Sequence, residues 1–170
     1  MATVQLQNPF TKEIVFEQPS ETFSEVSDKI ARARAAHQRW NRVPAETRAH
    51  LARQALDVFR NAEESISVAI AQEMGKTKMA AAQELAFMIE RAEHMCAQAA
   101  DGALNNLDLS AYHDEAFQGS IRYSGKGVVY IISPWNYPLF TAINGVICAL
   151  LSGSTVVLKH TTTPSVGKLM

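Results

Sequence analysis

The sequence has 170 residues, of which 47% are hydrophobic and 19% are charged, and its formal net charge is −1. This composition is that of an ordinary globular domain, without the basic excess that indicates a nucleic-acid partner or an anionic membrane surface. The longest apolar stretch, residues 146–151, is far too short to span a bilayer. Since no charged segment followed by a long apolar one begins the chain, we expect no signal peptide and a cytoplasmic protein.

Two cysteines and five histidines are the side chains that favour a soft metal ion. No histidine has zinc-ligand spacing to a cysteine, so we expect no metal site. Without a sign of export, a disulfide between Cys96 and Cys148 is not expected either. Cys96 belongs to the apolar face of a predicted helix, which favours a place in the core over a ligand role.

The first two-thirds of the sequence is predicted to be helical. Apolar residues recur at helical spacing between Phe23 and Trp40. Pro44 interrupts that pattern and suits the first turn of a second helix, whose apolar stripe runs from Leu51 to Phe59. Each stripe predicts an amphipathic helix.

Two further helices follow. The third is predicted over about residues 62–74, because Gly75 and Lys76 come next, as they do after a helix C-terminus. The fourth is the longest and ends near Asp101 and Gly102. Its wide apolar face consists of Leu85, Met88, Ile89, Ala92, Met95, Cys96 and Ala99.

The hydrophobic pattern changes after residue 109. Phe117, Ile121 and Tyr123 alternate with polar residues, which predicts a half-exposed antiparallel strand. Residues 125–127 contain two glycines and predict a turn before the next element.

The next part of the chain predicts a βαβ unit. Residues 128–132 form a continuous apolar run, which is typical of a strand buried on both faces. Two prolines mark residues 133–138 as a loop, and residues 139–151 are long and apolar enough for a buried helix. Residues 155–158 predict a second buried strand, parallel to the first and joined to it by a right-handed crossover.

The predicted fold class is therefore α/β with an incomplete sheet. A parallel sheet is normally covered on both faces and has more than two strands. The helical region would cover one face, but the sequence ends soon after the second strand. We expect either a fragment or strands that pair with residues outside the chain.

Ligands of open α/β sheets bind beyond the carboxyl ends of the strands. The loop after the first predicted strand offers an indole and an amide, Trp135 and Asn136. Lys159 and the hydroxyls of residues 161–163 follow the second strand and suit a phosphate or a ribose. The sequence contains neither Gly-x-Gly-x-x-Gly nor a Walker A motif. Alternative roles remain open: Trp135 as a core anchor, Asn136 as a loop cap and Lys159 as a solvated strand end.

Four motifs resemble, in order and at similar spacing, motifs of the aldehyde dehydrogenase family. Residues 127–139 (GVVYIISPWNYPL) resemble the segment around its Pro-Trp-Asn-(Phe/Tyr)-Pro, and residues 153–159 (GSTVVLK) resemble its Gly-Asn-x-Val-x-Leu-Lys. Upstream, residues 8–13 (NPFTKE) resemble its Asn-Pro-Ala-Thr-Gly-Glu, and residues 73–76 (EMGK) resemble the Glu-Met-Gly-Lys of semialdehyde-oxidising branches. The resemblance covers essentially the whole chain.

This resemblance implies the N-terminal part of a Rossmann-like cofactor domain. Residues 1–110 would form its helical N-terminal part, and residues 111–125 one strand of the oligomerisation hairpin. Residues 126–170 would form the first βαβ unit, truncated. The resemblance also implies a homo-oligomer that acts on a small-molecule aldehyde, with no nucleic-acid or membrane partner.

The family's reaction is covalent: a cysteine thiolate attacks the aldehyde, hydride passes to NAD or NADP, and a glutamate-activated water releases the acid. By resemblance, Asn136 would donate a hydrogen bond to the thiohemiacetal oxyanion. Tyr137 would face the substrate tunnel, and Lys159 would bind the adenosine ribose or its 2′-phosphate. The cofactor site would consist of Ile132, Ser133, Trp135, Lys159 and Thr162.

The sequence departs from the family pattern at positions that bear on function. By position Cys148 is not the catalytic cysteine, and the family's nucleophile and glutamate base lie downstream of residue 170. Thr162 falls near a position where NAD-preferring members often carry a glutamate that engages the ribose hydroxyls. Without that carboxylate a 2′-phosphate meets less repulsion, so we hypothesise that the intact enzyme tolerates NADP.

Two alternatives to a dehydrogenase segment follow from the chain length. The 170 residues would be a non-catalytic module that joins intact subunits through an unpaired hairpin strand, or a gene remnant without function. In each case we expect the isolated chain to transfer no hydride. The sequence does not identify the aldehyde, although residues 73–76 favour a semialdehyde.

Overall fold

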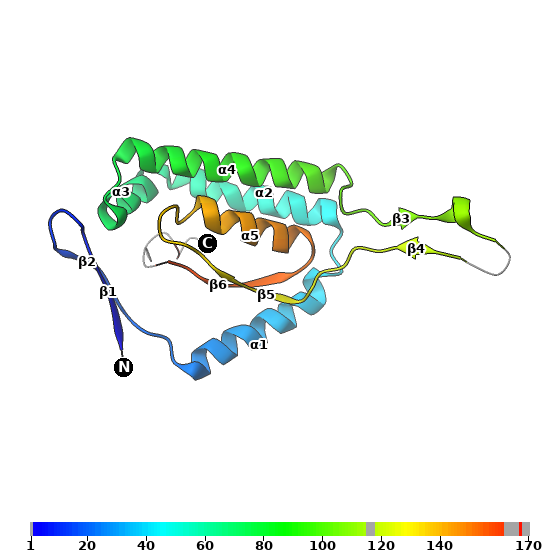
Figure 1. The fold of residues 1–170 in the computed structure, drawn as a ribbon, viewed down its shortest axis with the longest axis horizontal. Helices are drawn as coiled ribbons and strands as arrows, with labels where there is room; N and C mark the ends of the chain where they lie inside the picture. Colours follow the sequence, from blue (N-terminus) through cyan, green and yellow to red (C-terminus); the bar gives the residue numbers. More distant parts are fainter. Residues whose placement is uncertain (1, 115–117, 162–166, 168–170) are drawn as a thin grey trace.

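The computed structural model of the chain describes residues 2–114, 118–161 and 167. Its helices are α1 (Phe23–Trp40), α2 (Ala45–Asn61), α3 (Glu63–Met74), α4 (Lys78–Ala100) and α5 (Phe140–Leu151), with a 3-10 turn at Ser110–Tyr112. Its strands are β1 (Thr3–Gln7), β2 (Ile14–Pro19), β3 (Leu107–Asp108), β4 (Ser120–Ile121), β5 (Val128–Ile132) and β6 (Thr155–Lys159). In Figure 1, α2 and α4 lie over α5, the β5–β6 sheet lies beneath α5, and α1 covers the opposite side of that sheet.

The helices predicted in the first two-thirds of the chain are confirmed, and their ends have local chemical causes. Thr22 and Glu25 form a capping box at the start of α1, where each side chain accepts the other's backbone N–H. Helix α3 ends at Gly75, whose φ of +72° is costly for residues with a Cβ. The Thr77 hydroxyl accepts the N–H of Ala80 and caps α4.

The core lies where the apolar faces of α2, α3, α4 and α5 meet. Cys96 is fully buried in it, as predicted, and burial raises the pKa of its thiol. Helix α5 is the most apolar of the five but has 12 residues, and no helix among the described residues could cross a membrane. The buried cluster consists of Ala49, Leu56, Phe59, Ile66, Ile70, Ala81, Leu85, Met88, Ala92, Cys96, Ala99, Leu139, Ile143, Ile147 and Leu151.

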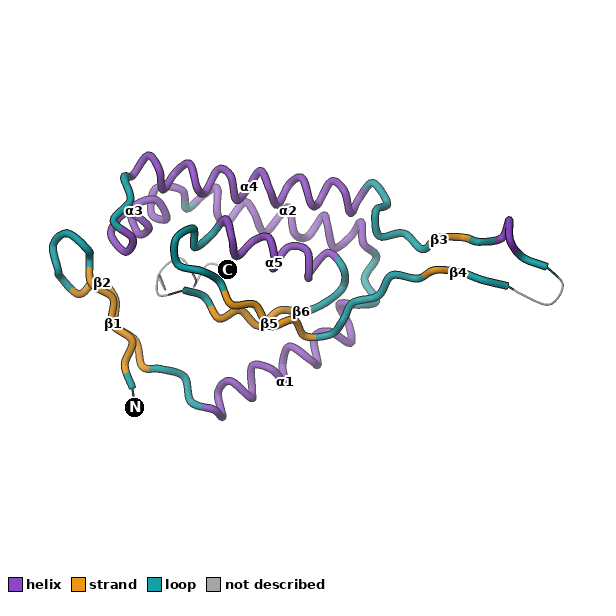
Figure 2. The backbone as a smooth tube through the Cα atoms, in the orientation of Figure 1, coloured by secondary structure: helices purple, strands orange, loops and turns teal. Residues whose placement is uncertain are grey.

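The predicted βαβ unit is confirmed: β5 and β6 are parallel, and α5 connects them (Figure 2). The prediction that both strands are fully buried is wrong, because Tyr130 and Ile132 of β5 are 60% and 67% exposed and β6 is half-buried. On the other face of β5, Ile131 packs against Gly145 of α5. Helix α1 contacts β6, where the Thr155 hydroxyl donates to a backbone carbonyl of α1, more extensively than it contacts β5, so β5 is less covered on that side.

The N-terminal hairpin is a correction to the predicted helical region. Residues 3–19 form the antiparallel pair β1–β2, in which Val4 faces Gln18 across the register. The turn between the strands is held by the Asn8 carboxamide, which accepts the N–H groups of Phe10 and Thr11. Val4 and Leu6 alternate with polar residues in β1, so the strand signal was present but short.

The second hairpin confirms the antiparallel pairing expected after residue 109, but its strands are short. Only Ser120–Ile121 of the predicted strand is extended and paired, and Phe117 lies outside the described residues. Its partner, Leu107–Asp108, was not predicted, because two residues carry no periodicity. Figure 1 shows this hairpin projecting from one end of the body.

Candidate functional site

The carboxyl ends of β5 and β6 lie side by side and bring predicted cofactor residues together. Ile132 and Lys159 are register partners across the parallel pair. The N–H of Ser133 donates to the carbonyl of Lys159 at 3.1 Å and extends the ladder beyond β5. Ser133 is buried, whereas Ile132 and Lys159 are exposed. The strand ends therefore present an apolar side chain beside an ammonium group.

The loop after β5, residues 133–138, is anchored at both ends against the end of β6. Ring nitrogen Nε2 of His160 donates to the carbonyl of Pro138 at 3.1 Å. The Ser133 hydroxyl also points toward the Pro138 carbonyl, at 3.5 Å. The two prolines disfavour a helix in the loop, and residues 135–137 between these anchors form a bend. The middle of the loop is therefore held outward.

Three exposed side chains occupy the middle of this loop. Trp135 is 66% exposed, so it does not act as a core anchor. Within the described part of the chain the Asn136 carboxamide forms no hydrogen bond, so it does not cap the loop. Tyr137 is 46% exposed and contacts a cation, as described below. An unbonded amide has two N–H donors available to an external acceptor.

Helix α5 begins directly after this loop, at a buried carboxylate from α4. Glu84 is 1% exposed, and its Oε1 accepts the N–H of Leu139 at 2.9 Å and that of Phe140 at 3.4 Å. The first N–H groups of a helix lack intrahelical partners, and a negative charge there is favourable to the helix dipole. Glu84 therefore fixes the position where the loop becomes helix.

Lys76 connects this carboxylate to the exposed loop. Its Nζ lies 2.6 Å from Oε2 of Glu84 and 3.8 Å from the ring centroid of Tyr137. The first contact is a charge-assisted hydrogen bond and the second is a cation–π interaction. A shallow hollow beside these residues is lined by Thr77, Phe87 and Tyr137 among others.

The N-terminal hairpin packs against the segment that carries Lys76. A Cβ at Gly75 would lie 2.6 Å from Pro9 Cγ and 3.1 Å from a ring carbon of Phe10. Such distances leave no room for a side chain, so the turn of the β1–β2 hairpin requires a glycine here. The segments 8–13, 73–76 and 134–138, which are far apart in sequence, therefore meet at one place.

The opposite end of α5 is held by side chains that the sequence did not single out. Arg48 Nε donates to the carbonyl of Leu151, and Trp40 Nε1 donates to that of Leu150, each at 2.9 Å. His37 makes a comparable contact, at 3.1 Å, to the carbonyl that follows the cap. Burial lowers the pKa of Arg48, and the helix C-terminus offers a favourable place for its charge.

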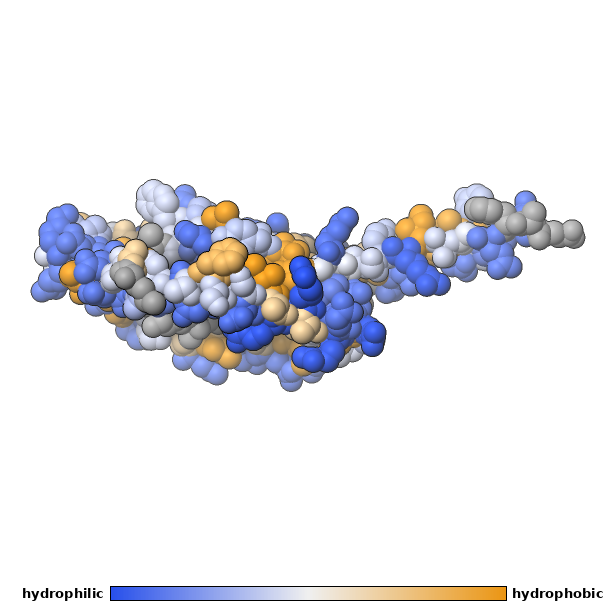
Figure 3. Space-filling model, turned by 90° about the horizontal axis from the view of Figure 1, so that it is seen from below, coloured by the Kyte–Doolittle hydropathy of each residue, from blue (hydrophilic) through white to orange (hydrophobic). Residues whose placement is uncertain are grey.

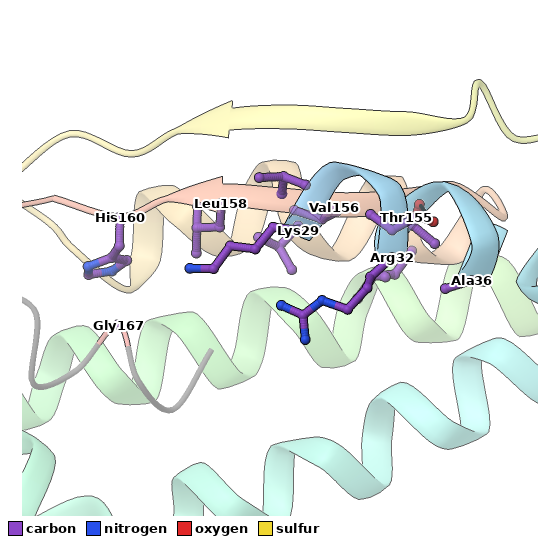
Figure 4. A pocket seen from close by; sticks show the side chains of 12 residues that line it. Lys29, Arg32, Ala36, Thr155, Val156, Leu158, His160 and Gly167 are labelled. Atoms are coloured by element: carbon purple, nitrogen blue, oxygen red, sulfur yellow. Dashed lines mark hydrogen bonds between the residues drawn. The ribbon is translucent and has the colours of Figure 1, made fainter. Parts of the chain in front are cut away.

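A cavity of about 600 Å³ follows the edge of β6 that faces away from β5. Figure 4 shows Lys29 and Arg32 of α1 alongside Val156 and Leu158 of β6 among its lining residues. None of the exposed loop residues lines this cavity, so we do not assign it to the predicted site. Among the described residues, no group of three or more His, Cys, Asp or Glu side chains is placed to hold a metal ion.

Three residues at this site escaped the sequence prediction. Glu84 and His160 were not proposed for any role, and Lys76 was noted only as a helix-end signal and as part of a motif. A signal for Glu84 existed, since it is an acidic residue inside the apolar stripe that includes Leu85 and Met88. The predicted cofactor residue at position 162 lies outside the described residues.

The sequence model of the aldehyde dehydrogenase family matches residues 2–170. The chain belongs to that family. Relatives include a putative succinate-semialdehyde dehydrogenase [NADP(+)] 2 of Mycobacterium ulcerans, 31% identical over 83% of this chain and 27% of the relative. An aldehyde dehydrogenase of Paenarthrobacter nicotinovorans is 32% identical over 82% of this chain and 30% of its own length. The chain thus spans less than a third of these relatives.

Solved structures of aldehyde dehydrogenases share this fold. An NADP-dependent glyceraldehyde-3-phosphate dehydrogenase from Bacillus halodurans, complexed with NADP, matches with a TM-score of 0.80 and 26% identity over 99% of this chain and 36% of that chain. An NAD-dependent benzaldehyde dehydrogenase from Corynebacterium glutamicum matches with a TM-score of 0.88 and 24% identity over 98% of this chain and 36% of that chain. The predicted fold class, the N-terminal part of a Rossmann-like domain with an incomplete sheet, is confirmed.

Proposed function

We propose that the protein carrying this chain is an NAD(P)-dependent aldehyde dehydrogenase, which oxidises an aldehyde or semialdehyde to the carboxylic acid. The observation that carries the proposal is the exposed, unbonded amide of Asn136 on a loop beyond a parallel strand. Ligands of open α/β sheets bind at this end of the strands. The family of the chain and the names of its relatives support the same reaction class.

In this proposal Asn136 is a catalytic residue. When a thiolate adds to the aldehyde carbon, the carbonyl oxygen becomes an oxyanion, and the Asn136 N–H groups donate to it. Tyr137 borders the path of the aldehyde next to that amide. The family's nucleophilic cysteine has no counterpart by position in these 170 residues, since Cys96 is buried in the core and Cys148 lies on α5.

The dinucleotide accepts the hydride when it is bound, and the strand ends of this chain fit such a ligand. Ile132 offers an exposed apolar side chain, and its register partner Lys159 offers a cation for a ribose hydroxyl or a phosphate. Ser133 and Trp135 would line the same channel, and Thr162 would lie near the ribose. These roles remain assignments by family motif, and the geometry of the strand ends supports them.

The finer preferences of the enzyme are also proposals. We propose that it tolerates NADP, because position 162 carries a neutral threonine instead of a carboxylate that would repel a 2′-phosphate. A relative whose name specifies NADP(+) and succinate semialdehyde supports this preference and a semialdehyde substrate. An enzyme that bound NAD far more tightly than NADP would contradict the cofactor preference.

The β3–β4 hairpin supports the proposal of a homo-oligomer. Figure 3 shows it as an arm that projects from the body and carries apolar surface. Leu107, Ile121 and Tyr123 are about half exposed on it, and Tyr112 at the 3-10 turn is 81% exposed. Apolar surface on a projecting arm favours burial against another subunit. We propose the division into residues 1–110, 111–125 and 126–170, and a cytoplasmic location, on the same family basis.

Aldehyde-dependent reduction of NAD and NADP by the protein as its gene encodes it tests the proposed function. A panel of simple aldehydes and semialdehydes with each cofactor should give activity with at least one pair. Residues 1–170 expressed alone should give none. No activity with any pair, in a folded protein that contains a nucleophilic cysteine at the family position, would exclude the dehydrogenase. Activity of the isolated 170-residue chain would contradict the proposal that the catalytic cysteine has no counterpart in these residues. Binding of that chain to intact subunits would favour the non-catalytic alternative.

A further inference from the structure

One buried and one partly buried charged side chain have no part in the proposed reaction. The side chain of Glu84 is 0% exposed and that of Lys76 is 19% exposed. Burying a carboxylate is expensive unless hydrogen bonds and an opposite charge compensate for the lost water. A leucine or methionine in place of Glu84 would continue the apolar stripe of α4 at lower cost. The pair therefore calls for a reason other than packing.

Glu84 divides its two oxygens between two different tasks. Oε1 accepts the N–H groups of Leu139 and Phe140, and so holds the first turn of α5. Oε2 accepts a hydrogen bond from Lys76 Nζ at 2.6 Å. Because α4 is packed across the core, this carboxylate provides a rigid point to which both the start of α5 and the lysine are tied.

Lys76 in turn holds the ring of Tyr137. Its Nζ is 3.8 Å from the ring centroid, which is within the range of a cation–π contact. The lysine cannot move far, since Glu84 binds it from one side and Gly75 before it is pinned by Pro9 of the hairpin turn. Tyr137 is otherwise half exposed, so this contact limits how the loop moves.

We propose that Lys76 and Glu84 are positioning residues for the loop that carries Asn136. Glu84 fixes the residue that ends the loop, and Lys76 fixes the ring next to the catalytic amide. The inference rests on the proposed function, because it assigns these two residues to the same site. Displacements of about 1 Å at a reacting centre can lower a rate about 100-fold, so a buried pair that fixes this loop serves catalysis.

The kinetic test compares Lys76→Met with Lys78→Met in the protein as its gene encodes it. Lys78 is a matched control, because it is two residues away, exposed, and paired with exposed Glu64. We expect Lys76→Met to lower kcat/KM for the aldehyde by about tenfold or more while KM for NAD(P) stays within twofold. Lys76→Arg should restore most of the loss, because guanidinium also pairs with carboxylate and stacks on aromatic rings.

A spectroscopic test does not depend on activity, and its first measurement uses the wild-type protein. In the wild-type protein the ε-methylene protons of Lys76 should resonate upfield of the other lysines, because the Nζ next to that methylene lies 3.8 Å from the centroid of the Tyr137 ring. Tyr137→Leu should abolish that shift and leave Lys78 unchanged. Absence of the shift in the wild type would overturn the inference.

The two tests separate the inference from the function on which it rests. An inactive wild type with a shifted Lys76 signal would overturn the proposed function and leave the contact established. An active wild type in which Lys76→Met and Lys78→Met have equal kcat/KM would overturn the positioning role alone. A loss in Lys76→Met that also raises KM for NAD(P) by the same factor would indicate a general structural role, and it too would overturn the inference.

Discussion

Each end of α5 is held by a buried charged side chain, but the two ends differ in what they border. At the N-terminus a buried carboxylate, Glu84, accepts two backbone N–H groups. At the C-terminus a buried guanidinium, that of Arg48, donates to the carbonyl of Leu151, and Trp40 donates to that of Leu150. Each charge has the sign that complements the helix dipole at its end. The N-terminal end borders the loop that carries the exposed, unbonded amide of Asn136.

The comparison distinguishes a helix cap that serves stability alone from a cap that also lies beside the proposed catalytic loop. The C-terminal cap leads into β6 through Gly153, whose φ of +89° allows the turn, and Ser154 accepts the N–H of Lys126 there. Among the described residues, no buried side-chain nitrogen or oxygen at this end lacks a hydrogen-bond partner. At the N-terminal end, Asn136 is left available and Lys76 extends the cap toward it. Variants at the two ends should therefore separate stability from activity.

The largest expected effect is on activity, at the N-terminal end. Asn136→Ala should lower kcat by about 100- to 1000-fold, because it removes a donor to the oxyanion. Its melting temperature should stay near that of the wild type, since the amide has no partner in the described part of the chain. Steady-state kinetics and thermal unfolding measure the two quantities. A wild-type kcat in this variant would show that Asn136 does not take part in the reaction.

The next effect is on stability, at the C-terminal end. Arg48→Met should lower the free energy of unfolding by about 2–3 kcal/mol, because the carbonyls of Leu151 and Val43 lose a charged donor inside the protein. The folded fraction should keep its kcat, since Arg48 is remote from the loop. Urea titration measures the loss. A fall in kcat per folded molecule as large as that in Asn136→Ala would show that the two ends of α5 do not affect stability and activity separately.

A smaller loss is expected at Trp40, beside Arg48. Trp40→Phe keeps an aromatic ring and removes one hydrogen bond, that from Nε1 to the carbonyl of Leu150. The free energy of unfolding should fall by about 1 kcal/mol. Differential scanning calorimetry of the variant and the wild type gives the difference. A loss as large as that of Arg48→Met would mean that ring packing, and not the hydrogen bond, dominates at this position.

The smallest effect is expected from the exposed ion pair near the N-terminal end. Lys78→Met removes the contact with Glu64, whose side chain is 76% exposed. Exposed pairs contribute about 0.5 kcal/mol or less, so neither stability nor kinetics should change measurably. Raising the salt concentration should have equally little effect on the wild type. A loss above about 1 kcal/mol would show that this surface pair is coupled to the buried Lys76–Glu84 pair.

Much of the fold could be predicted, because long segments carry strong periodic signals. The four N-terminal helices and the β5–α5–β6 unit were found from apolar spacing and from Gly75 and Pro44 at their ends. Strand β4 was predicted, but the β1–β2 hairpin and strand β3 were not, since β1 is mostly exposed and β3 has two residues. The burial of β5 was overestimated. A run of apolar residues indicates that a strand tends to be buried, but it does not show which neighbouring element covers the strand.

The candidate site was predicted only as far as its motifs reach. The sequence pointed to Asn136, Tyr137 and the strand ends, and the structure brings Ile132 and Lys159 together as register partners. It gave no reason to connect Lys76 with Tyr137, which is 61 positions later in the sequence. Pairing between side chains of different elements depends on how helices cross, and no local pattern reports that.

The sequence by itself determined the family, the helices, the crossover and the residues that present polar groups after the strands. Those features depend on local periodicity, on glycine and proline, and on short motifs, which act within a few residues. Only the tertiary structure decided that Glu84 and Lys76 meet the loop and that Arg48 closes the other end of α5. A buried charge is stable only beside its partners, and the packing of α4 and α5 across the core places those partners.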